Sequence, residues 1–221
     1  MGETLIRTLV PWLRVASAGT SAARGSAMHP LAERVLAAQG MSPAGHEARQ
    51  LTAGHIASAR LLLTATRAHR SRIIELLPVA VDRCFTIREL GRLLLAAEPE
   101  AVGTAPPSDP IGHVLDLAGR QLRRDPPDQH DDIADPIGRP VEAFEHCLVQ
   151  LRTSLTPRVE AVGVAGSRVE GTVAACCAKP VAGRPVGSDG RVPPPVPVSR
   201  DDGRRRRCDR RVRRSGCPAA G

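Results

Sequence analysis

Aromatic side chains are almost missing from this 221-residue chain. Trp12, Phe85 and Phe144 are the whole set, and tyrosine is absent. A hydrophobic core must therefore be built from leucine, valine, isoleucine and alanine. The absence of tyrosine also excludes regulation by phosphorylation of the chain's own tyrosines.

Long apolar runs are missing as well. No segment reaches the ~18 consecutive apolar residues that a membrane span requires, so we expect no membrane partner. The apolar stretch near the N-terminus is interrupted by Arg7, Pro11 and Arg14, and Glu3 precedes any basic residue. This pattern argues against a secretory signal. We expect a cytoplasmic protein.

The cysteines show none of the spacings that bind metals. They form no Cys-x-x-Cys pair and have no histidine partners at zinc spacing, so we predict neither a metal site nor a cofactor. Cys84 and Cys147 lie in apolar segments and are interpreted as small buried hydrophobic residues in a reduced compartment. We interpret the remaining four as incidental: Cys176, Cys177, Cys208 and Cys217.

The net charge of +8 belongs to one end of the chain. Residues 1–157 hold 17 basic and 17 acidic residues, whereas residues 158–221 hold 14 basic and six acidic ones. The second segment contains Pro193-Pro194-Pro195 and the run Arg204 to Arg207, with little apolar periodicity. We predict a disordered tail over 158–221. Its arginines can contact nucleic acid, but without aromatics for base stacking we do not expect specific nucleic-acid binding.

Hydrophobic periodicity in residues 1–157 alternates between helix and strand. Apolar residues at helical spacing predict helices at 2–13, 31–39, 67–77, 87–97, 111–124 and 140–155, and short apolar runs predict strands at 14–18, 59–64 and 82–86. This alternation indicates an α/β fold with a doubly wound parallel sheet. In such a fold the ligand site lies at the carboxyl ends of the strands.

A loop near residue 135 concentrates carboxylates. Asp131, Asp132 and Asp135 lie within five residues, and Pro136 restricts the backbone just after the last of them. A carboxylate held in this way can serve as a general acid if a substrate binds beside it. A simple turn or helix cap is the alternative interpretation.

Several short blocks, in order and spacing over residues 1–157, resemble a low-molecular-weight protein-tyrosine phosphatase of the actinobacterial type. The blocks include Ser17-Ala18-Gly19-Thr20, Met28-His29-Pro30, Leu62-Leu63-Thr64-Ala65-Thr66-Arg67, Phe85-Thr86-Ile87-Arg88-Glu89-Leu90 and Asp132-Ile133-Ala134-Asp135-Pro136.

This resemblance implies a phosphatase mechanism. In the family, a cysteine thiolate in a Cys-x5-Arg-Ser loop attacks phosphotyrosine, while the loop's N–H groups and arginine hold the phosphoryl oxygens. An aspartate in an Asp-Pro loop protonates the leaving phenolate and then activates water. By resemblance Asp135 is this catalytic acid, and Asp132 belongs to the loop structure. The implied partner is a phosphotyrosine protein, for example a bacterial tyrosine kinase.

The chain departs from the family pattern in two places. No Cys-x5-Arg occurs before residue 84, and Cys84 lacks an arginine at the required spacing. Met1-Gly2-Glu3 matches the residues that follow the family's phosphate loop, so we expect an N-terminal truncation that removes the first strand and the nucleophile. The second departure is Ile137, a candidate substrate-binding residue where the family commonly places an aromatic ring.

The expected loss has structural and functional consequences. In the family that this chain resembles, the first strand lies between the strands placed here at 14–18 and 60–64, so its loss would leave their inner edges unpaired. We therefore predict an incomplete phosphatase-like domain over 1–157 that folds poorly and is inactive. A pseudophosphatase or regulatory binding module is the alternative. Arsenate reductase of the same fold ranks below it, because Cys84 and Cys147 are the only cysteines in the domain.

Overall fold

The computed structural model describes residues 1–43, 45–98, 109–163 and 172–177. The helices are α1 (Gly2–Leu9), α2 (Pro30–Ala38), α3 (Ala53–Ser58), α4 (Arg67–Leu76), α5 (Ile87–Ala96), α7 (Pro110–Leu122) and α8 (Val141–Gly163). Two 3₁₀ turns are η1 (Pro78–Arg83) and η2 (Gln129–Asp131). The strands are β1 (Arg14–Gly19), β2 (Leu61–Thr64), β3 (Cys84–Thr86) and β4 (Thr172–Cys177).

Side chains at the N-caps explain where several helices begin. Thr52, Thr66 and Asp109 each accept a hydrogen bond from a backbone N–H in the first turn of the helix that follows. Thr86 and Glu89 form a reciprocal capping box at the start of α5.

Helix α1 ends at Leu9, before the predicted helix end at residue 13. Pro11 explains this difference, because proline disfavours a helical conformation in the residue before it.

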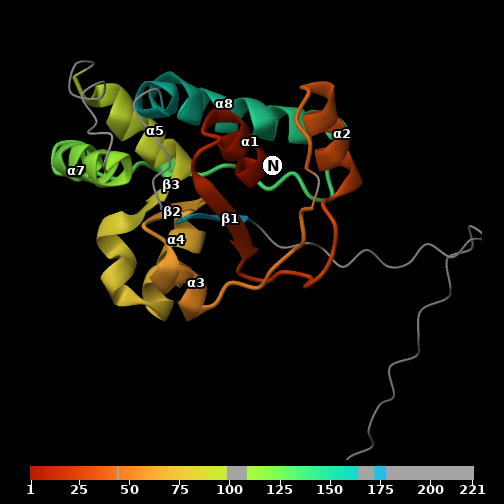
Figure 1. Cartoon of the computed structure of the whole chain (residues 1–221), viewed down its shortest axis with the longest axis horizontal. Helices are drawn as coiled ribbons and strands as arrows, with labels where there is room; N and C mark the ends of the chain where they lie inside the picture. The colour runs from red at the N-terminus through yellow and green to blue at the C-terminus, as the bar shows by residue number, and fades with distance from the viewer. Residues whose placement is uncertain (44, 99–108, 164–171, 178–221) are drawn as a thin grey trace, which may run out of the picture. The chain divides into compact units, whose positions relative to one another are not determined.

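The sheet is parallel throughout and has the order β1-β4-β2-β3. The register pairs Ala16 of β1 with Ala174 of β4, and Ala174 with Leu62 of β2. The latest strand in the sequence therefore lies between the two earliest ones (Figure 1). Residues 61–64 of β2 are all buried, as expected for a strand that is covered on both faces.

The position of β4 corrects one prediction. We expected the inner edges of β1 and β2 to lack a partner, but β4 pairs with both of them. It comes from the segment that we predicted to be wholly disordered, and α8 also continues past residue 157 to Gly163. The strand Thr172–Cys177 is short and uncharged but has no alternating pattern, so periodicity could not detect it. The predicted disorder of 178–221 lies outside the described residues.

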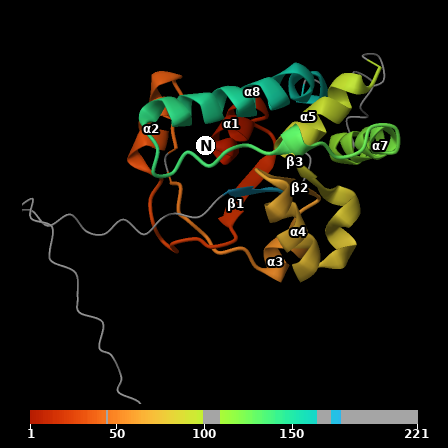
Figure 2. The ribbon, with the colours of Figure 1, turned by 180° about the vertical axis from the view of Figure 1, so that it is seen from behind.

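Helices cover both faces of the sheet. The larger core lies between the sheet and α1, α2, α5, α7 and α8, and it includes the buried Leu61, Leu63 and Phe85. The smaller core lies between the sheet and helices α3 and α4, which contribute Ile56 and Ile73. Figures 1 and 2 show these two groups of helices on opposite sides of the strands. Within the described ranges, no helix combines the length and the apolar character needed to cross a bilayer.

Candidate functional site

The loop that carries Asp135 is fastened to the end of β2. The N–H of Ile133 donates to the carbonyl oxygen of Ala65, which follows β2, at 2.8 Å, and the Ile133 side chain is buried. Asp135 itself is exposed, and its Oδ1 accepts the N–H of Ile137 at 3.0 Å. This turn around Pro136 holds the carboxylate at the surface beside the carboxyl end of the sheet.

The neighbouring carboxylates have different partners. Asp132 Oδ1 accepts the N–H of Arg67, the first residue of α4, at 2.7 Å. Asp131 is buried, and its Oδ2 accepts hydrogen bonds from Arg92 at 3.0 Å and from the N–H of Asp128 at 2.8 Å. Both hold the loop in place, in agreement with the predicted structural role of Asp132.

A cavity of about 200 Å³ opens beside Asp135. Asp135 and Ile137 both line it, so the structure brings the two predicted site residues together. Its walls include the ends of β1 and β2, the first turn of α1, and part of α8. The ring of His29 stacks on Phe144 at a centroid distance of 4.9 Å, and both residues line the cavity. The space is therefore largely apolar, with ionisable groups at a few positions.

One partly buried polar cluster at this cavity was not predicted from the sequence. Glu3, in the first turn of α1, accepts a hydrogen bond from the Ser17 hydroxyl and lies 3.5 Å from Nδ1 of His46. His46, followed by Ser17, lowers the pKa of Glu3 to about 2 despite partial burial of the carboxylate. Glu3 is therefore ionised at neutral pH and joins α1 to β1 and to the loop before α3.

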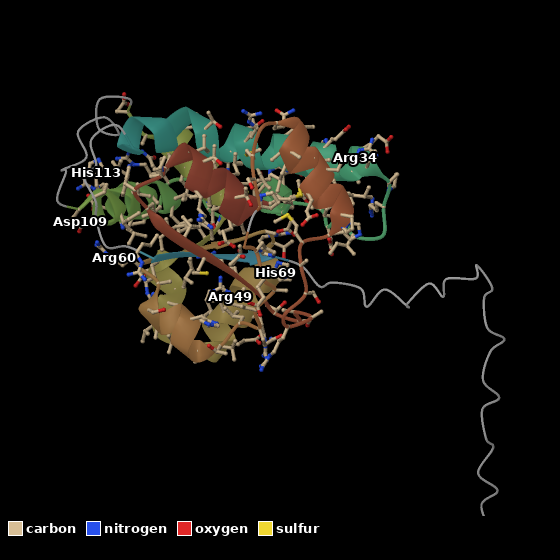
Figure 3. The ribbon with its side chains drawn as sticks, turned by 45° about the vertical axis from the view of Figure 1, so that its right-hand side comes forward. Arg34, Arg49, Arg60, His69, Asp109 and His113 are labelled. Carbon is tan, nitrogen blue, oxygen red and sulfur yellow. The ribbon has the colours of Figure 1, made fainter. Side chains whose placement is uncertain are left out.

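Two basic residues, Arg49 and His69, lie near Asp135. Arg49 is exposed and lines the cavity, and its carbonyl oxygen accepts the N–H of Gly19 at 2.8 Å. His69 is half-buried, with Nδ1 3.0 Å from the Thr66 hydroxyl. Burial lowers the pKa of His69, although the charge of Asp135 opposes this shift. In Figure 3, Arg49 and His69 lie toward the end of β1, whereas Arg60 lies toward the opposite end of the sheet.

Cys84 lacks the properties of an activated nucleophile. Cys84 is buried at the start of β3 and does not line the cavity. Burial raises the pKa of its thiol to about 12, so little thiolate forms at neutral pH. Cys147 lines the cavity from α8, but it is also buried.

The register of β4 brings the backbone of two further cysteines near the cavity. Cys176 pairs with Ala18 and Thr64, and Cys177 pairs with Gly19. Ala18 and Gly19 line the cavity, so the backbone of this strand ends beside it. The sequence analysis treated both cysteines as incidental, because a strand at 172–177 was not foreseen.

A Cys-x5-Arg-Ser spacing also occurs once in the sequence, from Cys208 to Ser215. It lies in the arginine-rich segment outside the described residues. Its intervening residues are Asp-Arg-Arg-Val-Arg, without a glycine to allow close backbone approach to a phosphate.

Comparisons with known proteins agree with this fold. The model of the low molecular weight phosphotyrosine protein phosphatase family matches residues 1–96. A protein-arginine-phosphatase of Geobacillus stearothermophilus is 29% identical over 144 residues, which are 65% of this chain and 73% of that protein. A probable low molecular weight protein-tyrosine-phosphatase of Ralstonia nicotianae, EpsP, is 25% identical over 166 residues, which are 74% of this chain and 88% of that one.

A solved structure shows the same architecture. The Erwinia amylovora tyrosine phosphatase amsI superposes with a TM-score of 0.52 at 22% identity, covering 72% of this chain and 82% of that one. At this identity the likeness concerns the fold. Residues 1–96 thus match the low molecular weight phosphotyrosine protein phosphatase family in sequence, and the fold is that of solved tyrosine phosphatases.

Proposed function

We propose that the cavity beside Asp135 receives a phosphorylated protein side chain and that Asp135 is the acid facing its leaving group. The observation that carries this proposal is that Asp135 and Ile137 line one cavity with Arg49 and the first turn of α1. The arginine can pair with an anion, and an exposed carboxyl group can donate a proton to a departing phenolate oxygen or guanidine nitrogen.

The substrate class follows from the lining and from the relatives. The names of the two relatives specify arginine and tyrosine phosphatases. Ile137 is half-buried and presents an aliphatic surface, which can contact either a phosphorylated arginine stem or a tyrosine ring. We propose a phosphorylated protein as the partner, and the cytoplasm stays the predicted location.

We further infer that the chain binds such a side chain without turning it over efficiently. The residues that match the family model contain one cysteine, Cys84, which is buried and carries a raised pKa. A phosphocysteine intermediate requires a thiolate within reach of the phosphorus, and Cys84 does not meet this requirement. This favours a regulatory binding module over an efficient hydrolase.

Two measurements test the proposal with the purified full chain. Labelled phosphotyrosine and phosphoarginine peptides should bind, and Arg49→Glu and Ile137→Asp should weaken binding about tenfold, since each places a negative charge beside the phosphate. Arg34→Glu is the control, because Arg34 is exposed on α2 and outside the cavity (Figure 3). Equal loss in all three variants would overturn the proposed site.

Hydrolysis of p-nitrophenyl phosphate tests the second inference. We expect no turnover above that of the Asp135→Asn variant. Turnover that disappears in Cys176→Ser, Cys177→Ser or Cys208→Ser would overturn the inferred inactivity and identify the nucleophile. The binding experiment would remain valid in that case, so the two inferences can fail separately.

A further inference from the structure

A second recess lies at the β3 edge of the sheet, outside the cavity beside Asp135. It is a groove of about 660 Å³ between η1 and α7, next to the residues where β3 begins. In Figure 1, η1 is the yellow segment below α7. We name it the η1–α7 groove; its apolar lining includes Val79, Val81, Leu115 and Leu122.

The apolar part of the groove is unusually exposed. Val79 is 74% exposed and Val81 is 41% exposed, and both belong to η1. Single exposed aliphatic residues are common on protein surfaces, but here two of them border a recess with further aliphatic side chains on its α7 side. This surface can bury apolar side chains of another protein segment.

The charged part of the groove has a positive excess. Four guanidinium groups and two carboxylates line it: Arg70, Arg83, Arg120, Arg123, Asp82 and Asp116. A groove with an excess of one charge attracts ligands of the opposite sign and increases their association rate.

Two of these arginines form the fixed base of the groove. Arg70 donates through Nε to the carbonyl oxygen of Cys84 at 2.7 Å. Arg83 donates to the carbonyl oxygen of Ile56 at 3.0 Å. Both side chains are half-buried. Arg70 also lies 3.6 Å from the carboxylate of Glu89, so of these two arginines only Arg83 has no carboxylate partner among the described residues.

The other two arginines are available to a ligand. Arg120 is exposed and bridges Asp116 on its own helix at 2.6 Å, an exposed pair of low stability. Arg123 is exposed, and its side chain has no hydrogen bond or ion pair among the described residues. Both can turn toward carboxylates that enter the groove, and guanidinium groups bind carboxylates in a bidentate manner.

We propose that the η1–α7 groove binds an acidic segment of a partner protein that also carries aliphatic side chains. The aliphatic side chains would cover Val79 and Val81, and its carboxylates would pair with Arg120 and Arg123. Charge excludes the chain's own C-terminal segment as the occupant, because residues 158–221 hold 14 basic and six acidic residues. This site is separate from the Asp135 cavity and does not depend on the proposed function.

Fluorescence anisotropy of a labelled peptide tests the groove in the full chain. The probe has a central pair of valines flanked by glutamates. We expect the Arg120→Glu/Arg123→Glu variant to bind it about tenfold more weakly than the wild type, and Val79→Ser about threefold more weakly. A probe with serines in place of the valines should also bind about threefold more weakly to the wild type.

The matched control is Arg24→Glu/Arg34→Glu. It changes the net charge by the same amount at two exposed arginines outside the groove. An equal loss of affinity in both double variants would show general charge attraction and overturn the proposal. Concentration-dependent dimerisation that Val79→Ser abolishes would also overturn it, because a second copy would then occupy the groove.

Discussion

Replacing Ala174 by proline should destabilise the protein strongly, because this residue lies in the middle of the central strand. Ala174 pairs with Ala16 on one side and with Leu62 on the other. Every N–H of a central strand bonds to one neighbour or the other, so proline at this position must remove a ladder hydrogen bond. The carbonyl left without a donor costs about 1–3 kcal/mol. The ring's steric conflict with the ladder raises the expected loss to about 3 kcal/mol.

Urea unfolding followed by circular dichroism measures this loss. With a denaturant slope of about 1–3 kcal/mol per molar, a loss of about 3 kcal/mol lowers the midpoint by roughly 1–3 M. Ala174→Gly is the control, since it keeps the N–H and should cost only about 0.5–1 kcal/mol. Equal midpoints for the proline variant and the wild type would refute the placement of β4 in the sheet. The edges of β1 and β2 would then be unpaired, as we expected from the sequence.

Three further substitutions test other contacts. A Cβ on Gly91 of α5 would clash with the backbone carbonyl oxygen of Ser154 in α8, so Gly91→Ala should lower the free energy of unfolding by about 1–3 kcal/mol, measured as a lower melting temperature. Gly119 has open space around it, so Gly119→Ala should raise the free energy of unfolding by about 0.5–1 kcal/mol. The pKa of Glu3 is lowered from 4.5 to about 2, so its carboxylate stabilises the fold above about pH 4.5, and this contribution is lost as the pH falls toward 2. The difference in free energy of unfolding between the wild type and Glu3→Gln should therefore decrease from about pH 6 to about pH 3. Arg70 lies 3.6 Å from Glu89, which is 1% exposed, so Arg70→Met should lower the free energy of unfolding in urea by about 3 kcal/mol. Adding Glu89→Gln removes the buried charge and should restore part of this stability, whereas no restoration would contradict a charge effect.

Local sequence patterns were sufficient for most of the fold. The strands β1, β2 and β3 and most of the helices follow from apolar spacing, because each buries a face whose period matches its structure. Helix α3 was missed, since six residues with one buried side chain, Ile56, show no period. The strand β4 was missed for a related reason. Its placement depends on the unfilled space between β1 and β2, which no pattern within residues 172–177 encodes.

The site was accessible from the sequence only in part. Asp135 and Ile137 could be named from the family resemblance, and the structure places both at one cavity. The cluster of Glu3, Ser17 and His46 could not be foreseen, because its members are far apart in sequence and meet only when α1 packs against β1. The lowered pKa of Glu3 depends on these tertiary contacts, so no local sequence pattern predicts it.

The place of β4 also sets the order in which the sheet can be completed. In the finished sheet β1 and β2 are not neighbours, and each pairs with β4, which the ribosome makes after the other three described strands. At roughly 5–20 residues per second, on the order of ten seconds separate the synthesis of β2 from that of β4. During this interval two parallel edges remain open, and closing them requires contacts between distant parts of the chain, which form slowly. The nascent protein is therefore exposed to edge-to-edge aggregation, and we expect its yield to depend on chaperones and on growth temperature.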